Sequence, residues 1–301
     1  MRLVGGGCLE GDSYPEAEIE DLLEDEIAPE DRRLARRVFV NIISQVDLAD
    51  PDIKFKDLIE KLDEHARESS EFKSKSEASA KAALAKMHGD WFEWLLCNIA
   101  QQSNLTPGLP IAAIKLPNVV QFDSTNLYVE ELRTMIGSLR TEVRKSSVEL
   151  ISSNPDFVLV QRELVDLLPP AGLDATELLV NWHERRYLQL VGRCTFESIY
   201  GYLAAKYTLR PDRRLQIAHE SSLMKALYVH LQTRLWNTTP RGLRFHAVST
   251  RVGNKDRAAL KTVATHSITT VGSVPQAAVD TLHETKSLGD AQSMFREILA
   301  S

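Results

Sequence analysis

A predicted strand that leads directly into a long helix, between residues 199 and 236, constrains the fold of this chain more than any other stretch. Residues 199–208 are rich in aromatic and β-branched types, which are typical of strands. Pro211 suits the first position of a helix, and no Gly or Pro interrupts the sequence from there to about Trp236. Alternation along the strand places four side chains on one face: Tyr200, Tyr202, Ala204 and Lys206.

The predicted helix carries one acidic residue where an apolar side chain is expected. Its buried stripe, at helical spacing, consists of Ile217, Glu220, Met224, Leu227 and Leu231. A carboxylate on such a stripe costs free energy unless it is paired or ligates a metal ion. Glu220 is therefore a candidate functional residue.

The beginning of this helix is unusual because it is basic. Arg213 lies in the first turn after Asp212, and Arg210 precedes the helix. Positive side chains at a helix N-terminus oppose the helix dipole, so an anionic partner approaching this end would explain them. The alternative is a cluster of solvated arginines, with Asp212 as an ordinary acid of the first turn.

A short stretch upstream can supply partners for Glu220. Pro155 and Asp156 lead into the apolar run 157–160, which predicts a short strand. A strand-borne Asp156, a strand-borne Lys206 and a helix-borne Glu220 could meet at one phosphate group.

The order and spacing of these residues resemble a known family. The pattern is Pro-Asp at 155–156, Lys-x-x-x-Arg-Pro-Asp-Arg at 206–213, and Glu220 seven residues after the last arginine. It is similar to the CCGG group of type II restriction endonucleases in the PD-(D/E)XK nuclease superfamily, which includes NgoMIV and BsaWI. In this family the second acidic ligand has moved to the helix after the lysine, which matches Glu220. One departure is Ala204, because the family often has a small polar residue two positions before the lysine.

The resemblance implies an α/β fold in which a mixed central sheet is flanked by helices. It also implies Mg²⁺-dependent hydrolysis of double-stranded DNA, with Asp156 and Glu220 as ligands of the metal. Lys206 would orient the attacking water and stabilise the transition state. Cleavage before the first C of a palindromic CCGG site would leave 5′ overhangs, and a palindrome suits a two-fold homodimer.

The resemblance assigns the CCGG core to the start of the helix. Arg210, Asp212 and Arg213 are expected to contact bases in the major groove. Arginine pairs with guanine, and a carboxylate accepts a hydrogen bond from the cytosine amine.

An early helix carries two further candidates. Family members have an acidic residue near the metal site, with a residue seven positions before it that reaches the minor groove, and Glu93 and Lys86 fit this spacing. Glu93 could position a second metal ion or hold Lys206 by a hydrogen bond. The alternative is that Glu93 faces solvent and Lys86 is an ordinary surface lysine.

The net charge of −6 is unusual for a DNA-binding protein, but the charges are unevenly distributed. Residues 10–31 contain 11 acids and no base, whereas residues 201–261 contain 12 Lys or Arg against three acids. The basic region coincides with the candidate site, as binding to a phosphate backbone requires.

The sequence predicts an acidic helical appendage over residues 1–74 and a nuclease domain over residues 75–301. Expected helices, besides the one described above, span residues 30–46, 54–67, 75–103, 127–148, 276–287 and 290–300. Expected strands, besides the two described above, span residues 110–115, 119–122, 243–248 and 267–274.

The chain shows no apolar run of membrane-spanning length and no signal peptide, and its three cysteines form neither a disulfide framework nor a zinc pattern. A cytoplasmic protein is therefore expected. Two other functions remain open at this point. One is a DNA-binding protein without catalysis, and the other is an unrelated helical interaction protein, which would leave Glu220 unexplained.

Overall fold

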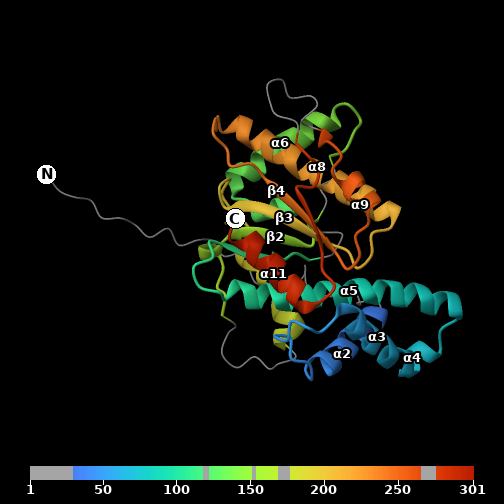
Figure 1. Ribbon diagram of the computed structural model, residues 1–301. Coiled ribbons are helices and arrows are strands. Elements are labelled where there is room, and N and C mark those ends of the chain that lie inside the picture. Colours follow the sequence, from blue (N-terminus) through green and yellow to red (C-terminus); the bar gives the residue numbers. More distant parts are fainter. Residues whose placement is uncertain (1–29, 118–121, 151–153, 169–176, 266–275) are drawn as a thin grey trace, which may run out of the picture.

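A five-stranded sheet with helices on both faces forms the centre of the molecule (Figure 1). The computed structural model describes residues 30–117, 122–150, 154–168, 177–265 and 276–301. The strands, in spatial order, are β1 (Ile111–Lys115), β2 (Phe157–Gln161), β3 (Ile199–Ala205), β4 (Arg244–Ser249) and β5 (Thr281–Glu284). Strands β1, β2 and β3 pair antiparallel, and β3, β4 and β5 pair parallel. This mixed sheet flanked by helices confirms the predicted fold class.

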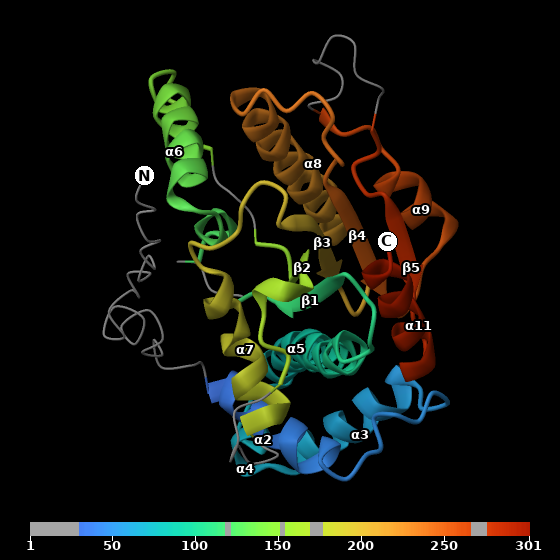
Figure 2. The same cartoon turned by 90° about the vertical axis from the view of Figure 1, so that its left-hand side faces the viewer.

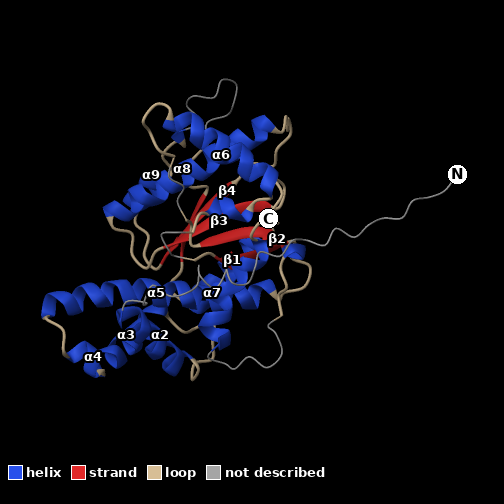
Figure 3. Cartoon of the chain, turned by 180° about the vertical axis from the view of Figure 1, so that it is seen from behind, coloured by secondary structure: helices blue, strands red, loops and turns tan. Residues whose placement is uncertain are grey.

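The helices form two layers around the sheet (Figure 3). Their bounds are α2 (Glu30–Ile43), α3 (Phe55–Glu68), α4 (Ser70–Lys73), α5 (Glu77–Asn104), α6 (Glu130–Arg144), α7 (His183–Arg185), α8 (Pro211–Arg234), α9 (Asn254–Leu260) and α11 (Leu288–Leu299). Helices α6 and α8 contribute to the apolar core on one face of the sheet, and α5 and α11 contribute to the core on the other. In β2, Phe157 and Leu159 pack toward α5 and α11, whereas Val158 and Val160 pack toward α6 and α8.

The alternation of side chains fails at one place in β3. Tyr200 packs with the core on the α5 side, whereas Tyr202 lies in the core on the α8 side. The prediction that both share one face is therefore wrong. The physical reason is a β-bulge, because the register with β3 shifts by one residue between Leu159 and Val160. The neighbouring Gly201 is also required, since a Cβ there would lie 2.3 Å from the carbonyl oxygen of Arg244.

The N-terminal helices pack beneath α5, on the side away from β1 (Figure 2). The apolar residues of α2, α3 and α4 belong to the same core cluster as those of α5 and α11. The indole nitrogen of Trp91 in α5 donates to the carbonyl of Ala35 in α2 over 2.9 Å. The Leu288 amide at the start of α11 donates to the carbonyl of Ile53 over 2.9 Å. These helices are thus tied both to α5 and to the C-terminal helix.

Most expected elements occur within a few residues of their predicted bounds, and one is wrong. Residues 281–284, expected within a helix over 276–287, form β5 instead. They pair with β4 in parallel, so the tertiary pairing outweighs the local helical pattern. The expected strand 267–274 lies outside the described residues, as do residues 119–121 of the expected strand 119–122 and residues 1–29. Among the described helices, none is both long and apolar enough to cross a membrane.

Candidate active site

Asp156 and Lys206 lie side by side at one edge of the sheet, at the start of β2 and the end of β3. Asp156 directly precedes β2 and Lys206 directly follows β3, and the register pairs Phe157 with Leu203. The start of one antiparallel strand lies beside the end of its neighbour, so both side chains reach the same edge of the sheet. Lys206 Nζ donates to Asp156 Oδ2 over 2.9 Å, and the backbone amide of Ala205 donates to the same oxygen over 2.6 Å.

Glu220 joins this pair from α8. The stripe predicted from the sequence is buried, and Glu220 is only 3% exposed. Burial disfavours the Lys206 ammonium, but the carboxylates of Asp156, Glu93 and Glu220 raise the pKa of Lys206 above its ordinary value. Lys206 is therefore a protonated cation at neutral pH, surrounded by three acidic side chains.

Glu93 is buried in α5, so the alternative that it faces solvent is wrong. Its Oε2 accepts a hydrogen bond from Lys115 Nζ over 2.7 Å. Within the described part of the chain its ion-pair partner is Lys115 and not Lys206. Burial raises the pKa of Glu93, and the Lys115 ammonium opposes that shift.

Lys115, the last residue of β1, was not among the predicted site residues. Its position at the end of an otherwise apolar run, Ile-Ala-Ala-Ile-Lys, is the signal that could have identified it. The side chain is 4% exposed, and a buried lysine requires a compensating acid. Burial disfavours the ammonium, but Glu93 and Asp156 raise the pKa of Lys115 above its ordinary value.

The five charged side chains of this cluster suit a hard divalent cation. Glu93, Asp156 and Glu220 are carboxylates, and Lys115 and Lys206 are cations, which leaves one negative charge for a bound ion to balance. Asp156 Oδ1 accepts no hydrogen bond from the described residues, so it offers an oxygen to a ligand. The described residues contain no ready-made group of three or more ligating side chains. Mg²⁺ fits this donor set, because it takes one or two carboxylates and keeps several waters.

The candidate base-contacting residues lie at the surface, at the start of α8. Arg210 and Asp212 are exposed, and the Arg210 guanidinium donates to Asp212 Oδ2 over 2.9 Å. Arg213 is partly exposed and donates to the carbonyl of Thr208 over 3.2 Å. Lys86 is an exposed residue of α5, two turns before the buried Glu93. The structure therefore brings Asp156, Lys206, Glu220 and Glu93 into one cluster, of which Lys206 is partly exposed, and leaves the other four candidates accessible.

Arg214, a residue without a role in the sequence analysis, connects the start of α8 to α9. Its guanidinium donates to Asp256 Oδ1 over 2.8 Å. The other carboxylate oxygen of Asp256 accepts the amide of Gly253 over 2.7 Å and so caps α9. Helix α9, which carries Lys255 and Arg257, is thereby held beside the start of α8 (Figure 1).

Comparison with solved structures gives the class of the protein. The chain is similar to the crystal structure of the type IIF restriction endonuclease Bse634I with cognate DNA, with a TM-score of 0.73 and 29% identity over 82% of this chain and 86% of that one. A second structure, of the Bse634I restriction endonuclease, gives the same TM-score and covers 87% of that chain. The mixed sheet with its buried charged cluster is therefore a restriction endonuclease fold.

Sequence comparison then gives the family. The chain is 41% identical over 222 residues to the type II restriction enzyme Cfr10I of Citrobacter freundii, covering 72% of this chain and 78% of that protein. The model of the Cfr10I/Bse634I restriction endonuclease family matches residues 20–301. The chain belongs to this family and is a type II site-specific deoxyribonuclease. The enzyme prediction is confirmed, and the two alternatives, a DNA-binding protein without catalysis and a helical interaction protein, are set aside.

Proposed function

We propose that this enzyme cleaves double-stranded DNA in a Mg²⁺-dependent reaction at a palindromic site containing CCGG, before the first C, and leaves 5′ overhangs. The enzyme would belong to the PD-(D/E)XK superfamily and be related to the NgoMIV and BsaWI group. The observation that carries it is the part-buried contact of Lys206 with Asp156, within 3 Å, beside Glu220 and Glu93. A lysine held among carboxylates at a sheet edge is suited to phosphodiester hydrolysis.

Each residue of the cluster has a distinct task in this reaction. Asp156 and Glu220 would hold Mg²⁺, which when bound neutralises charge on the scissile phosphate and acidifies water. Lys206 keeps its proton and places a compact positive charge where negative charge develops in the transition state. Asp156 also fixes the position of Lys206 through their hydrogen bond. Glu93 adds negative charge behind this pair.

Base recognition is assigned to the start of α8. Arg210 and Arg213 would pair with the two guanines of each strand of the core, and Asp212 would accept from a cytosine amine. Lys86 would approach the minor groove from α5. The basic residues of α9 would contact phosphates, which adds affinity that does not depend on sequence.

A homodimer follows from the palindromic site, because a two-fold axis places one active site on each strand. The related Bse634I has been solved with cognate DNA, which supports double-stranded DNA as the partner. The proposal also places the enzyme in the cytoplasm. Residues 75–301 would form the nuclease domain and residues 1–74 an acidic helical appendage.

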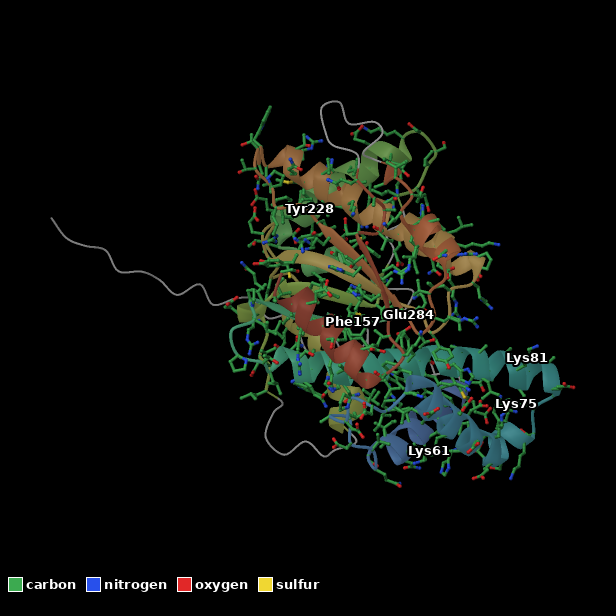
Figure 4. All side chains as sticks on the ribbon, viewed as in Figure 1. Lys61, Lys75, Lys81, Phe157, Tyr228 and Glu284 are labelled. Atoms are coloured by element: carbon green, nitrogen blue, oxygen red, sulfur yellow. The ribbon has the colours of Figure 1, made fainter. Side chains whose placement is uncertain are left out.

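Replacement of the cluster residues tests the proposed chemistry. Lys206→Ala should lower the single-turnover cleavage rate about a hundredfold to a thousandfold, because it removes charge stabilisation in the transition state. It should still retard cognate DNA in a gel. Asp156→Ala and Glu220→Ala should also be inactive, through loss of metal. Lys81→Ala, an exposed lysine at the far end of α5 (Figure 4), is the matched control and should cut normally.

Digestion of a sequenced phage DNA with Mg²⁺, followed by mapping of the ends, tests the site and the cut position. A thermal melt of each variant excludes unfolding as the cause of lost activity. Near-normal cutting by Glu220→Ala would remove Glu220 from the site. Ends that do not begin at CCGG would overturn the proposed specificity and leave the nuclease chemistry intact.

A further inference from the structure

The described active-site region contains two lysines, the partly exposed Lys206 and the buried Lys115, but the proposed reaction uses only Lys206. Lys206 contacts Asp156. Lys115 lies on β1, whose register with β2 pairs it with Phe157, the residue that follows Asp156. Its ammonium lies 5.8 Å from the centre of the Phe157 ring (Figure 4 labels Phe157) and 2.7 Å from Glu93 Oε2. Two ion pairs therefore lie next to each other at the same edge of the sheet.

Stability alone gives a poor account of the Lys115–Glu93 pair. The side chains are 4% and 10% exposed, so both charges have lost most of their water. An apolar pair of similar volume is often as stable as a buried ion pair, or more stable. The other four residues of β1 are apolar and buried, so an apolar residue at position 115 would continue the strand. A buried charge at this position points to a role in the neighbouring site.

Electrostatics suggests what that role is. Three carboxylates without Lys115 would leave Lys206 as the one balancing cation, and the cluster would attract divalent cations more strongly. With Lys115 present, one oxygen of Glu93 is engaged by an internal cation. The backbone amide of Leu116, the next residue, donates to the carbonyl of Asp156 over 2.9 Å, so the Lys115 strand is fixed relative to the Asp156 carboxylate.

We propose that Lys115 is a positioning residue that holds Glu93 by an ion pair, acts as an internal counter-ion of the active-site carboxylates and so sets a weak affinity for the divalent cation. This inference rests on the proposed function, because it assumes that Asp156 and Glu220 hold the metal. Removal of a unit charge close to a divalent ion in a partly buried site should change the cation affinity about tenfold or more. The sign is specific: loss of Lys115 should strengthen cation binding.

Calorimetric titration of the full-length protein with Ca²⁺ at low ionic strength measures this effect without any cleavage. Lys115→Met keeps the length of the side chain and removes its charge, and should bind Ca²⁺ about tenfold more tightly than the wild type. Lys115→Arg keeps the charge and should bind as the wild type does. Glu93→Gln should bind about tenfold more weakly. In the double variant Lys115→Met/Glu93→Gln the two changes oppose each other, and its affinity should lie within about threefold of the wild type.

A second readout is the Mg²⁺ concentration that gives half of the maximal cleavage rate on cognate DNA, which should fall in Lys115→Met. A purely structural lysine would lower the melting temperature without this shift. A folded Lys115→Met protein whose Ca²⁺ affinity is unchanged or weaker overturns the inference. If the single variant does not fold, a double variant that binds Ca²⁺ as weakly as Glu93→Gln overturns it as well.

Asp156→Asn separates this inference from the function on which it rests. Loss of Ca²⁺ binding in Asp156→Asn together with tighter binding in Lys115→Met supports both. Loss in Asp156→Asn with no change in Lys115→Met overturns only the role of Lys115. Unchanged Ca²⁺ binding in Asp156→Asn, or a wild type that takes up no Ca²⁺, overturns the metal site and the inference together.

Discussion

Burial determines the charge state of individual residues well beyond the active site. It raises the pKa of the Cys97 and Cys194 thiols to about 12, so both remain protonated and unreactive at neutral pH. Burial acts in the opposite direction on histidine, where the cation is the disfavoured form. It lowers the pKa of His183 and of His246 to about 3. These histidines are neutral in the folded protein under all ordinary conditions.

The depressed pKa of His246 predicts a loss of stability in mild acid. An unfolded histidine titrates near pH 6.5, so below that pH the unfolded chain binds a proton that the folded protein does not bind. Stability is fully present above about pH 6.5 and falls as the pH decreases toward the folded pKa of about 3. At about pH 5.5 the loss from this one residue is about 1.4 kcal/mol relative to neutral pH.

Denaturant unfolding of His246→Gln at about pH 7.5 and pH 5.5 tests this linkage. The variant cannot take up the proton, so its difference in unfolding free energy between the two pH values should be smaller by about 1.4 kcal/mol than that of the wild type. His219→Gln, at an exposed position of α8, is the matched control and should keep the wild-type difference. An equal pH dependence in His246→Gln and the wild type would contradict the prediction.

At the scale of single elements, α8 carries both a residue of the proposed catalytic cluster and the residues proposed to contact bases. Glu220 lies on the buried face of the helix, and Arg210 and Asp212 lie exposed at its start. Pro211 occupies the first helical position and fixes the backbone between them. If the proposed roles are right, a shift of the helix start on DNA would be transmitted along α8 to Glu220.

The acid at the start of α8 should distinguish base recognition from phosphate binding. A carboxylate repels phosphate groups but can accept a hydrogen bond from the amine of cytosine. Asp212→Ala should therefore reduce the preference for CCGG-containing duplex over scrambled duplex by about 1–3 kcal/mol. Lys255→Ala, on the neighbouring α9, should weaken binding to both duplexes alike. Competition gel shifts in Ca²⁺, at one fixed salt concentration, measure the ratio. If Asp212→Ala keeps the wild-type ratio, this helix start does not read bases.

The same helix shows why some elements were predictable and others were not. Its Pro start, its apolar spacing and the lone buried acid Glu220 are all local features, and the structure confirms them. Strand β5 has no such local signal, because its four residues become a strand only through parallel pairing with β4. The bulge at Tyr200 likewise depends on the register with β2.

The candidate site follows the same division. Asp156, Lys206 and Glu220 were found from their order along the chain, and they share one cluster. The partner of Glu93 could not be found in this way. Lys115 reaches it through the packing of β1 on α5, which no spacing in the sequence specifies.

At the scale of the whole molecule, the N-terminal helices and the sheet share a core. Phe55 of α3 is buried, and its backbone amide donates to the carbonyl of Lys286 over 2.9 Å. Gly289 of α11 is packed so tightly on Pro51 that a Cβ there would lie 2.7 Å from the proline side chain. The proposed boundary at residue 74 therefore separates segments of sequence whose apolar side chains are buried together.

The segment that precedes α2 is strongly acidic, and its charge affects how the molecule interacts with DNA. Residues 1–29 contain nine acids and one base, so without them the net charge changes from −6 to +2. Negative charge tethered to a DNA-binding protein lowers its affinity for DNA of any sequence through long-range repulsion. This repulsion is screened by salt, with a Debye length of about 10 Å at 0.1 M.

Deletion of residues 1–29 should therefore raise the affinity for scrambled duplex several-fold at low salt. The gain should shrink as the salt concentration rises, and cleavage at the cognate site should persist. Gel shifts with scrambled duplex over a series of salt concentrations measure the effect. A full-length variant with Gln in place of Glu16, Glu18, Glu20, Glu24 and Glu26 is the matched control and should reproduce part of the gain, because it removes charge without shortening the chain. Equal affinities of the deleted and full-length proteins at every salt concentration would show that the acidic segment does not repel DNA.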